Sequence, residues 1–126
     1  LAEGDDQQDP VVDTARAVLD GHIVLSRALA ERGHYPAIDI PASVSRCMGL
    51  VASPAHQRAA LQLKDMVGRH ERVRDLLPLG AYVAGADPAT DRAVALYPRI
   101  EAFLHQGAQE AAPLDATLNQ LEALMA

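Results

Sequence analysis

Three side chains that could take part in chemistry lie within one stretch of the sequence, residues 20–48. Tyr35 precedes a proline, Arg46 ends a Ser-Val-Ser-Arg segment, and Cys47 follows it directly. Taken alone, a tyrosine before proline is usually a packing residue at a turn, and a lone arginine is usually a surface ion-pair donor. No convincing base lies near Cys47 in the sequence, which favours a buried thiol over a nucleophile.

The five histidines form no metal-binding group of the H-E-x-x-H kind, and a single cysteine leaves no C-x-x-C pair. The sequence therefore predicts no metal site made by the chain itself. The histidines are His22, His34, His56, His70 and His105.

Short elements must position the residues of this stretch. An apolar run at residues 23–25 predicts a brief buried strand, and Ser26 can cap the helix that follows. Tyr35 lies beyond that helix, because the residue before a proline is pushed out of the helical region. Residues 38–40 alternate as a strand does, and Pro41 is expected to break this run.

Three segments here, LDGHIVLSR, GHYPAIDI and ASVSR, resemble in order and spacing the nucleotide-binding core of the rotary ATPase superfamily. The likeness is greatest to the flagellum-specific ATPases of the bacterial type III export apparatus, and it covers roughly residues 1–106. The family's phosphate-binding loop, G-x-x-x-x-G-K-[ST], is absent, as is its acidic magnesium-holding strand. The resemblance therefore implies that the chain is the C-terminal piece of a larger subunit.

The implied fold is mainly α with a small α/β part. Residues 1–52 would be the end of a RecA-like nucleotide-binding domain, and residues 53–126 a C-terminal helical domain. Composition agrees, because the chain is 49% hydrophobic with only 3% aromatic residues. A core made of Ala, Leu and Val favours helices over a sandwich.

Arg46 ends the segment in which the superfamily carries its arginine finger, a side chain that reaches into the neighbouring subunit's site. Phosphoryl transfer spreads negative charge over the terminal oxygens, and a planar, permanently charged fork can meet that charge from two directions. The resemblance implies this trans role for Arg46. It also makes Tyr35 the aromatic that stacks on the adenine of ATP, with Phe103 either closing the adenine pocket or serving as a core aromatic.

Residues 1–10 predict the end of a strand and an acidic loop, and a short helix capped by Asp13 or Thr14 is expected to follow. From the residues alone, this loop is best interpreted as solvated. In rotary ATPases the similar loop faces the central channel and touches the rotating stalk. The resemblance therefore implies contact with a basic coiled-coil stalk by Asp5, Asp6 and Asp9.

The second half of the chain predicts helices. Ser53 caps a long helix that is expected to reach about Leu77, and its interior Gly68 would allow a close crossing. Asp87 caps a second helix, which Pro98 should kink or split. A final helix carries a narrow apolar seam, expected to meet one other helix of its own bundle. The seam consists of Leu114, Leu118, Leu121 and Met125.

The resemblance implies a hexameric ATPase that couples ATP hydrolysis to the export of flagellar proteins, with magnesium arriving together with ATP. The implied partners are further copies of the subunit, a coiled-coil stalk, export chaperones with their substrates, and an export gate. The implied place is the cytoplasm, at the inner membrane. The chain alone is expected to be inactive because it lacks the phosphate-binding loop. Two alternatives stay open: a non-catalytic helical docking module, and the ATPase of a non-flagellar type III secretion system.

Charge and length set limits that do not depend on the resemblance. A chain of 126 residues fits one ordinary domain or a piece of a larger protein. Its formal net charge of -6 argues against a nucleic-acid partner and favours a basic one. A single cysteine is consistent with a reducing compartment. No apolar run approaches the roughly 20 residues of a membrane span.

Overall fold

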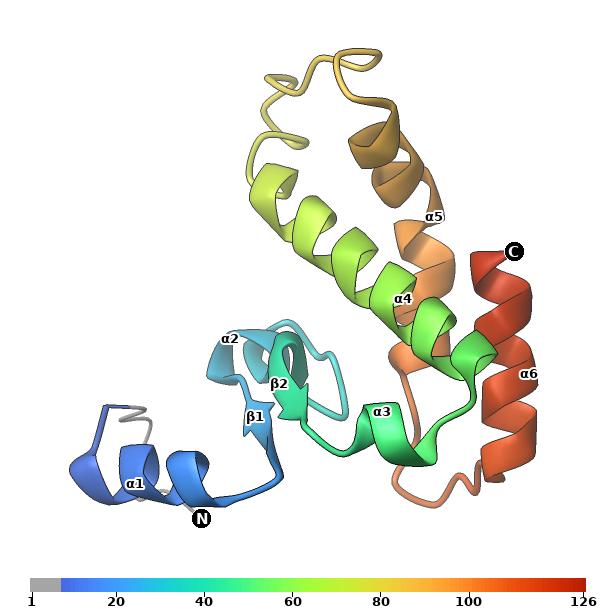
Figure 1. Ribbon diagram of the computed structural model, residues 1–126. Coiled ribbons are helices and arrows are strands. Elements are labelled where there is room, and N and C mark those ends of the chain that lie inside the picture. The colour runs from blue at the N-terminus through green and yellow to red at the C-terminus, as the bar shows by residue number, and fades with distance from the viewer. Residues whose placement is uncertain (1–7) are drawn as a thin grey trace. The chain divides into compact units, whose positions relative to one another are not determined.

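Helices dominate the computed structural model, which describes residues 8–126 (Figure 1). Within these residues, six helices accompany a single two-stranded sheet, which confirms the predicted fold class. The chain divides into two compact units, Leu1–Ala52 (unit 1) and Ser53–Ala126 (unit 2). Among the described residues, no helix is long and apolar enough to cross a membrane.

Unit 1 begins with α1 (Pro10–Val18) and continues through short elements. These include two strands, at residues 21–25 and 38–45, which pair antiparallel with Gly21 opposite Ser45 at one end and Leu25 opposite Ile38 at the other. Gly21 permits this close approach, because a Cβ there would lie 2.6 Å from the carbonyl oxygen of Val44. The elements after α1 are β1 (Gly21–Leu25), α2 (Arg27–Glu31), β2 (Ile38–Ser45) and α3 (Met48–Val51).

The first helix starts earlier than predicted. Asp9, and not Asp13 or Thr14, is its N-cap, and the Asp9 carboxylate accepts a hydrogen bond of 2.8 Å from the backbone N–H of Val11. Pro10 takes the first helical position, where its missing N–H costs no hydrogen bond. The Asp9-Pro10 pair is therefore a better helix start than Asp13 or Thr14, which both lie inside α1.

Pro41 does not break the second strand, contrary to the prediction. Between the pairs His22–Val44 and Val24–Asp39, β1 advances two residues (22 to 24) and β2 advances five (39 to 44), so three extra residues bulge out of β2. Pro41 lies in this bulge, where the ladder needs no N–H from it. The strand therefore resumes after the bulge and runs on to its last residue, Ser45.

Unit 2 is built from α4 (Pro54–Val73), α5 (Pro88–Leu104) and α6 (Leu114–Met125). Its two long helices begin where predicted: the Ser53 hydroxyl accepts from the N–H of His56 at 3.2 Å, and the Asp87 carboxylate accepts from the N–H of Ala89 at 3.2 Å. These caps satisfy N–H groups that have no partner inside the helix.

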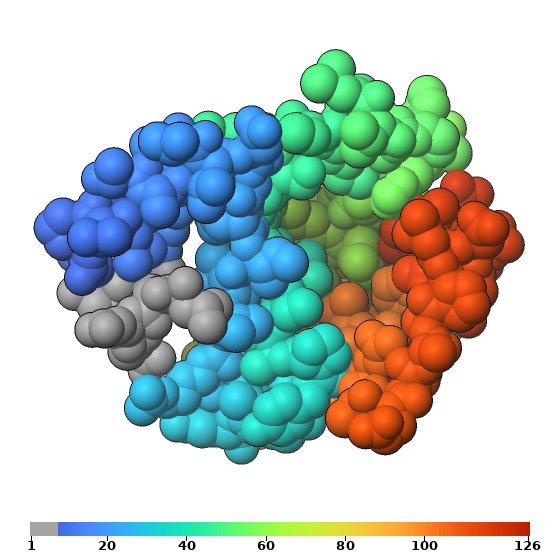
Figure 2. All heavy atoms as spheres, turned by 90° about the horizontal axis from the view of Figure 1, so that it is seen from below, coloured from blue at the N-terminus to red at the C-terminus, as the bar shows by residue number. Residues whose placement is uncertain are grey.

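The apolar core of the described residues lies entirely in unit 2. Ile100 of α5 has no exposed surface, and the ring of His70 stacks on that of Tyr97 with centroids 3.4 Å apart. In the space-filling view α6, in red, lies directly against α4, in green (Figure 2). The other buried apolar side chains are Ala59, Leu63, Met66, Val67, Ala93, Leu121, Leu124 and Met125.

One helix end differs from the prediction, and Pro98 does not split its helix. The first long helix stops at Val73, four residues before Leu77, because the carbonyl of Val73 accepts N–H groups from Leu76 and Leu77 at 2.9 and 3.2 Å and the chain tightens into a turn. Helical geometry is also disfavoured just before Pro78. Helix α5 passes through Pro98 without splitting, because packed residues on both sides of it hold the helix together.

Helix α6 packs on its own bundle, but it meets two helices and not one. It contacts both α4 and α5, so its buried face is wider than the predicted seam. Leu124 is buried although it lies outside that seam, whereas Leu114 is 69% exposed. A helix that sits against two others needs an apolar face wider than a coiled-coil seam.

The glycine inside α4 gives no close helix crossing. A Cβ added at Gly68 would meet no heavy atom within 4 Å. Gly68→Ala should therefore raise the free energy of unfolding of unit 2 by about 1 kcal/mol, because alanine loses less backbone entropy in a helix. Chemical denaturation followed by circular dichroism measures the change. Gly80→Ala is the control and should destabilise, since Gly80 has a φ of 64°. A loss of stability in Gly68→Ala would contradict the open environment of this position.

Candidate functional site

The sequence places Arg46 directly after β2, and the structure shows where its side chain lies. The residue is exposed, and its backbone N–H donates to the carbonyl of Asp20 at 2.8 Å. Its guanidinium donates to two carbonyls of α1, from Nη1 to Ala17 at 3.4 Å and from Nη2 to Arg16 at 3.3 Å. In the single chain, then, Arg46 contacts the C-terminal turn of the first helix.

This contact completes the last turn of α1. The final carbonyls of a helix have no donor within it. Here the carbonyl of Ala15 accepts the N–H of Leu19 at 3.0 Å, and the next two carbonyls accept from Arg46. The positive guanidinium also meets the negative end of the helix dipole, an interaction typically worth about 0.3–1 kcal/mol at an exposed terminus. Arg46 is thus a weak cap for α1.

The bulge of β2 shapes the approach to Arg46. The hydroxyl of Ser43 donates to the carbonyl of Asp39 at 2.6 Å and accepts from the N–H of Val24 at 3.0 Å. The carboxylate of Asp39 accepts from the N–H of Ala42 at 2.9 Å. Side chains thereby replace the ladder bonds that the extra residues cannot make, and they hold the strand end from which Arg46 emerges.

Tyr35 lies at the other end of the same strand. It sits in the connection between α2 and β2, and 57% of its surface is exposed. The structure shows no aromatic stacking partner for this ring among the described residues. Tyr35 and Arg46 flank β2 at opposite ends, so a whole strand separates the two predicted nucleotide-contact residues.

The remaining predicted site residues fall in three places. Asp9 caps α1, so its carboxylate already accepts one backbone N–H. Asp5 and Asp6 lie outside the described residues. Phe103 is half-buried on α5 and belongs to unit 2, whereas Tyr35 belongs to unit 1. The roles assigned to these residues and to Arg46 and Tyr35 stay predictions.

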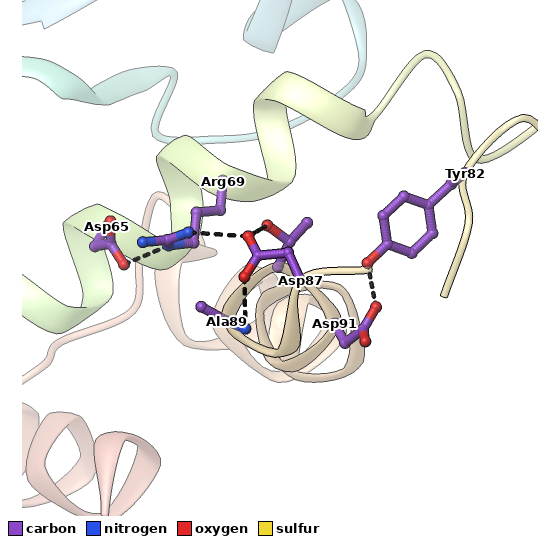
Figure 3. A network of polar contacts seen from close by, with 7 residues as sticks. Asp65, Arg69, Tyr82, Asp87, Ala89 and Asp91 are labelled. Carbon is purple, nitrogen blue, oxygen red and sulfur yellow. Dashed lines mark hydrogen bonds and ion pairs between the residues drawn. The ribbon is translucent and has the colours of Figure 1, made fainter. Parts of the chain in front are cut away.

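Unit 2 contains a polar network that the sequence did not predict (Figure 3). Arg69 of α4 donates to Asp65 at 2.7 Å and to Asp87 at 3.2 Å, and the hydroxyl of Thr90 donates to Asp87 at 2.5 Å. The hydrogen bond from Thr90 holds the pKa of the Asp87 carboxyl below its usual value. The hydrogen bond to Asp65 raises the pKa of Arg69. The network ties the start of α5 to α4.

A second part of this network holds the loop before α5. The hydroxyl of Tyr82 donates to the carboxylate of Asp91 (Figure 3). The same carboxylate accepts the N–H of Gly85 at 2.8 Å. The hydrogen bond to Asp91 raises the pKa of the Tyr82 phenol to about 12. The Asp65–Arg69 pair has a sequence signature, the spacing of four residues on one helix, and the Thr90–Asp87 hydrogen bond lies within the predicted cap of α5. The contact of Arg69 with Asp87 joins two separate helices, and the contacts of Asp91 join α5 to the loop before it.

The sequence matches two families over adjacent segments. Residues 52–123 match the family described as T3SS EscN ATPase C-terminal domain. Residues 1–45 match the nucleotide-binding domain of the ATP synthase alpha/beta family.

Similar proteins of known type cover nearly the whole chain. A flagellum-specific ATP synthase of Pseudomonas aeruginosa is 54% identical over 126 residues, all of this chain and 28% of the relative. A type 3 secretion system ATPase of Pseudomonas syringae pv. syringae is 54% identical over 121 residues, 96% of this chain and 27% of the relative. The chain thus spans little more than a quarter of these relatives.

A solved structure has the same fold. The assembled ATPase EscN of enteropathogenic E. coli, in complex with its central stalk EscO, superposes with a TM-score of 0.87 at 38% identity. The match covers 93% of this chain and 29% of the EscN chain.

Proposed function

The chain belongs to the family of type III secretion ATPase C-terminal domains, and on that premise we propose that it forms the C-terminal part of a ring-forming subunit that hydrolyses ATP to drive protein export. The observation that carries the proposal is Arg46, an exposed arginine held at a defined strand end, directly after residues 1–45, which match the ATP synthase nucleotide-binding domain. An exposed fork can reach beyond its own chain, as a trans arginine must.

Within this proposal, the residues at the two ends of β2 contact two different nucleotides. Tyr35 offers an exposed ring to the adenine of ATP in its own subunit, and Arg46 at the other end of the strand reaches the phosphates in the neighbouring one. Phe103 closes the adenine pocket. Magnesium arrives with the nucleotide and is held by residues outside these 126. Because no phosphate-binding loop lies in the chain, it does not hydrolyse ATP alone.

The partners follow from the same premise. We place six copies of the subunit around a coiled-coil stalk, in keeping with the assembled EscN–EscO complex, with Asp5, Asp6 and Asp9 facing the stalk. The further proposed partners are export chaperones with their substrates and an export gate. The proposed location of the assembled subunits is the cytoplasm, at the inner membrane. We assign the flagellar apparatus, because the flagellar relative aligns over all 126 residues and the equally identical secretion relative over 121.

A second candidate function is a non-catalytic docking module. Unit 2 supports it, because this unit contains every buried apolar side chain of the described residues and so has a core of its own. Such a bundle could bind chaperones, substrates or a stalk without any chemistry. Nucleotide dependence separates the two candidates, since a docking module would bind its partners equally well with or without ATP.

A pair of substitutions at Tyr35 tests the catalytic proposal. In a full-length subunit that contains this chain, Tyr35→Ala should weaken ATP affinity by about 1–3 kcal/mol, the usual contribution of stacking a base on an aromatic ring. Tyr35→Phe should bind nearly as well as the unmodified protein, because the ring is retained. Equilibrium titration with a fluorescent ATP analogue measures both. Equal losses in the two variants would point to a hydrogen bond from the hydroxyl and refute stacking.

A further inference from the structure

We propose that Arg46 has two positions, and that the C-terminal turn of α1 is its resting position. The inference rests on the proposed function, which supplies the working position at the neighbouring subunit's phosphates. The resting position is the one the structure shows, with both terminal nitrogens of Arg46 donating to consecutive carbonyls of Arg16 and Ala17. Helix α1 therefore regulates how available the arginine is.

The geometry of the contact makes it reversible. Both hydrogen bonds are long, at 3.3 and 3.4 Å, and the arginine is exposed to solvent. The acceptors are neutral carbonyls, whereas phosphoryl oxygens carry full negative charge and match the guanidinium fork. A phosphate group within reach should therefore outcompete the end of α1. The backbone of Arg46 stays anchored to Asp20 at 2.8 Å, so only the side chain has to move.

Helix α1 also connects the Arg46 contact to Asp9, one of the three proposed stalk-contact residues. Asp9 caps the first turn of α1, and Arg46 caps the last, so the two residues hold opposite ends of one nine-residue rod about 13 Å long. A partner that binds beside Asp9 and tilts α1 would displace the carbonyls of Arg16 and Ala17. That displacement would release Arg46 without any direct contact between the partner and the arginine.

Hydrogen exchange of α1 reports the resting contact directly. In the assembled full-length protein without nucleotide, Arg46→Ala should speed amide exchange in the last turn of α1 by about two- to fivefold, the range expected for losing a charge at an exposed helix end. Pulse labelling and mass spectrometry of the α1 peptide measure this. Unchanged exchange in Arg46→Ala would overturn the resting position.

Adding ADP, magnesium and aluminium fluoride tests the movement. This mimic of phosphoryl transfer should raise exchange at the end of α1 in the unmodified protein to the level of Arg46→Ala, and it should cause no further rise in that variant. If exchange in the unmodified protein stays constant although hydrolysis is inhibited, Arg46 does not leave α1 and the inference fails. An equal rise in Arg46→Ala would also overturn it, because α1 would then respond to the ring and not to the arginine.

Arg92 provides a matched control. It also contacts the end of a helix, α6, where its Nη2 donates to the backbone oxygens of Met125 and Ala126 at 3.3 and 3.5 Å. Arg92→Ala should change exchange in α6 only, and the mimic should not affect that peptide. Turnover separates the two hypotheses: if Arg46→Ala hydrolyses ATP at the normal rate, the proposed function fails. If turnover is lost but α1 exchange never changes, only the resting position fails.

Discussion

In an assembled ATPase that contains this chain, Arg46→Ala is expected to lower turnover by about 10³- to 10⁵-fold while nucleotide binding by the single subunit stays nearly unchanged. The proposed target charge develops in the neighbouring site and only in the transition state, so the interaction affects the rate and not the binding of ATP. Steady-state hydrolysis and equilibrium binding on the same preparation measure the two effects. Arg46→Lys should rescue poorly, because an ammonium lacks the planar fork.

The structure suggests a competing explanation for lost turnover, loss of the α1 cap, and the size of the measured loss distinguishes the two. A 10³- to 10⁵-fold loss corresponds to about 4–7 kcal/mol of activation free energy. The exposed helix cap contributes at most about 1 kcal/mol. A loss of only a fewfold in Arg46→Ala would therefore identify Arg46 as a cap and not as a catalytic residue.

Mixing tests whether Arg46 acts across the subunit interface. Subunits with Arg46→Ala, combined with subunits that lack the lysine of the upstream phosphate-binding loop, should recover some activity, because some interfaces then pair an intact site with an intact arginine. If mixed rings form but show no activity, there are two explanations. Either Arg46 acts within its own subunit, or the ring hydrolyses ATP only when every site does so in sequence. A ring with few Arg46→Ala subunits separates these: proportional loss indicates independent sites, and steeper loss indicates sequential firing.

The second large effect is expected in the core of unit 2. Ile100→Ala should lower the free energy of unfolding by about 2–5 kcal/mol, because Ile100 is fully buried and truncation leaves a cavity in addition to the lost apolar contact. Chemical denaturation followed by far-ultraviolet circular dichroism measures the change. This signal reports mainly on unit 2, which contains the three longest helices of the described residues.

Leu61 provides the control for this substitution. It lies on α4 with 70% of its surface exposed, so Leu61→Ala should change the free energy of unfolding by no more than about 0.5 kcal/mol. Similar losses in the two variants would show that α4 is covered in solution by a surface that the single chain does not include. A small loss in Ile100→Ala would contradict the packing of α5 against its neighbours.

The sequence by itself determined the features that depend on neighbours within about four residues. The caps at Ser26, Ser53 and Asp87 and the start of α4 at Pro54 were all predicted, because a cap bonds an N–H two or three residues ahead. The brief strand over residues 23–25 was predicted correctly from its apolar run, but its predicted burial was wrong, since Ile23 and Leu25 are 70% and 63% exposed. The family resemblance rested on the same kind of local order and spacing.

Only the tertiary structure decided the features that join distant segments. Pro41 is tolerated because β1 pairs across a bulge, and Arg46 caps a helix about 30 residues away in sequence. The buried face of α6 includes Leu124 and leaves Leu114 exposed, because α6 packs against two helices at once. Each outcome depends on which surfaces meet after the chain has closed loops of tens of residues. Local residue spacing does not predict which surfaces will meet, since the free energy of packing depends on segments that are far apart in sequence.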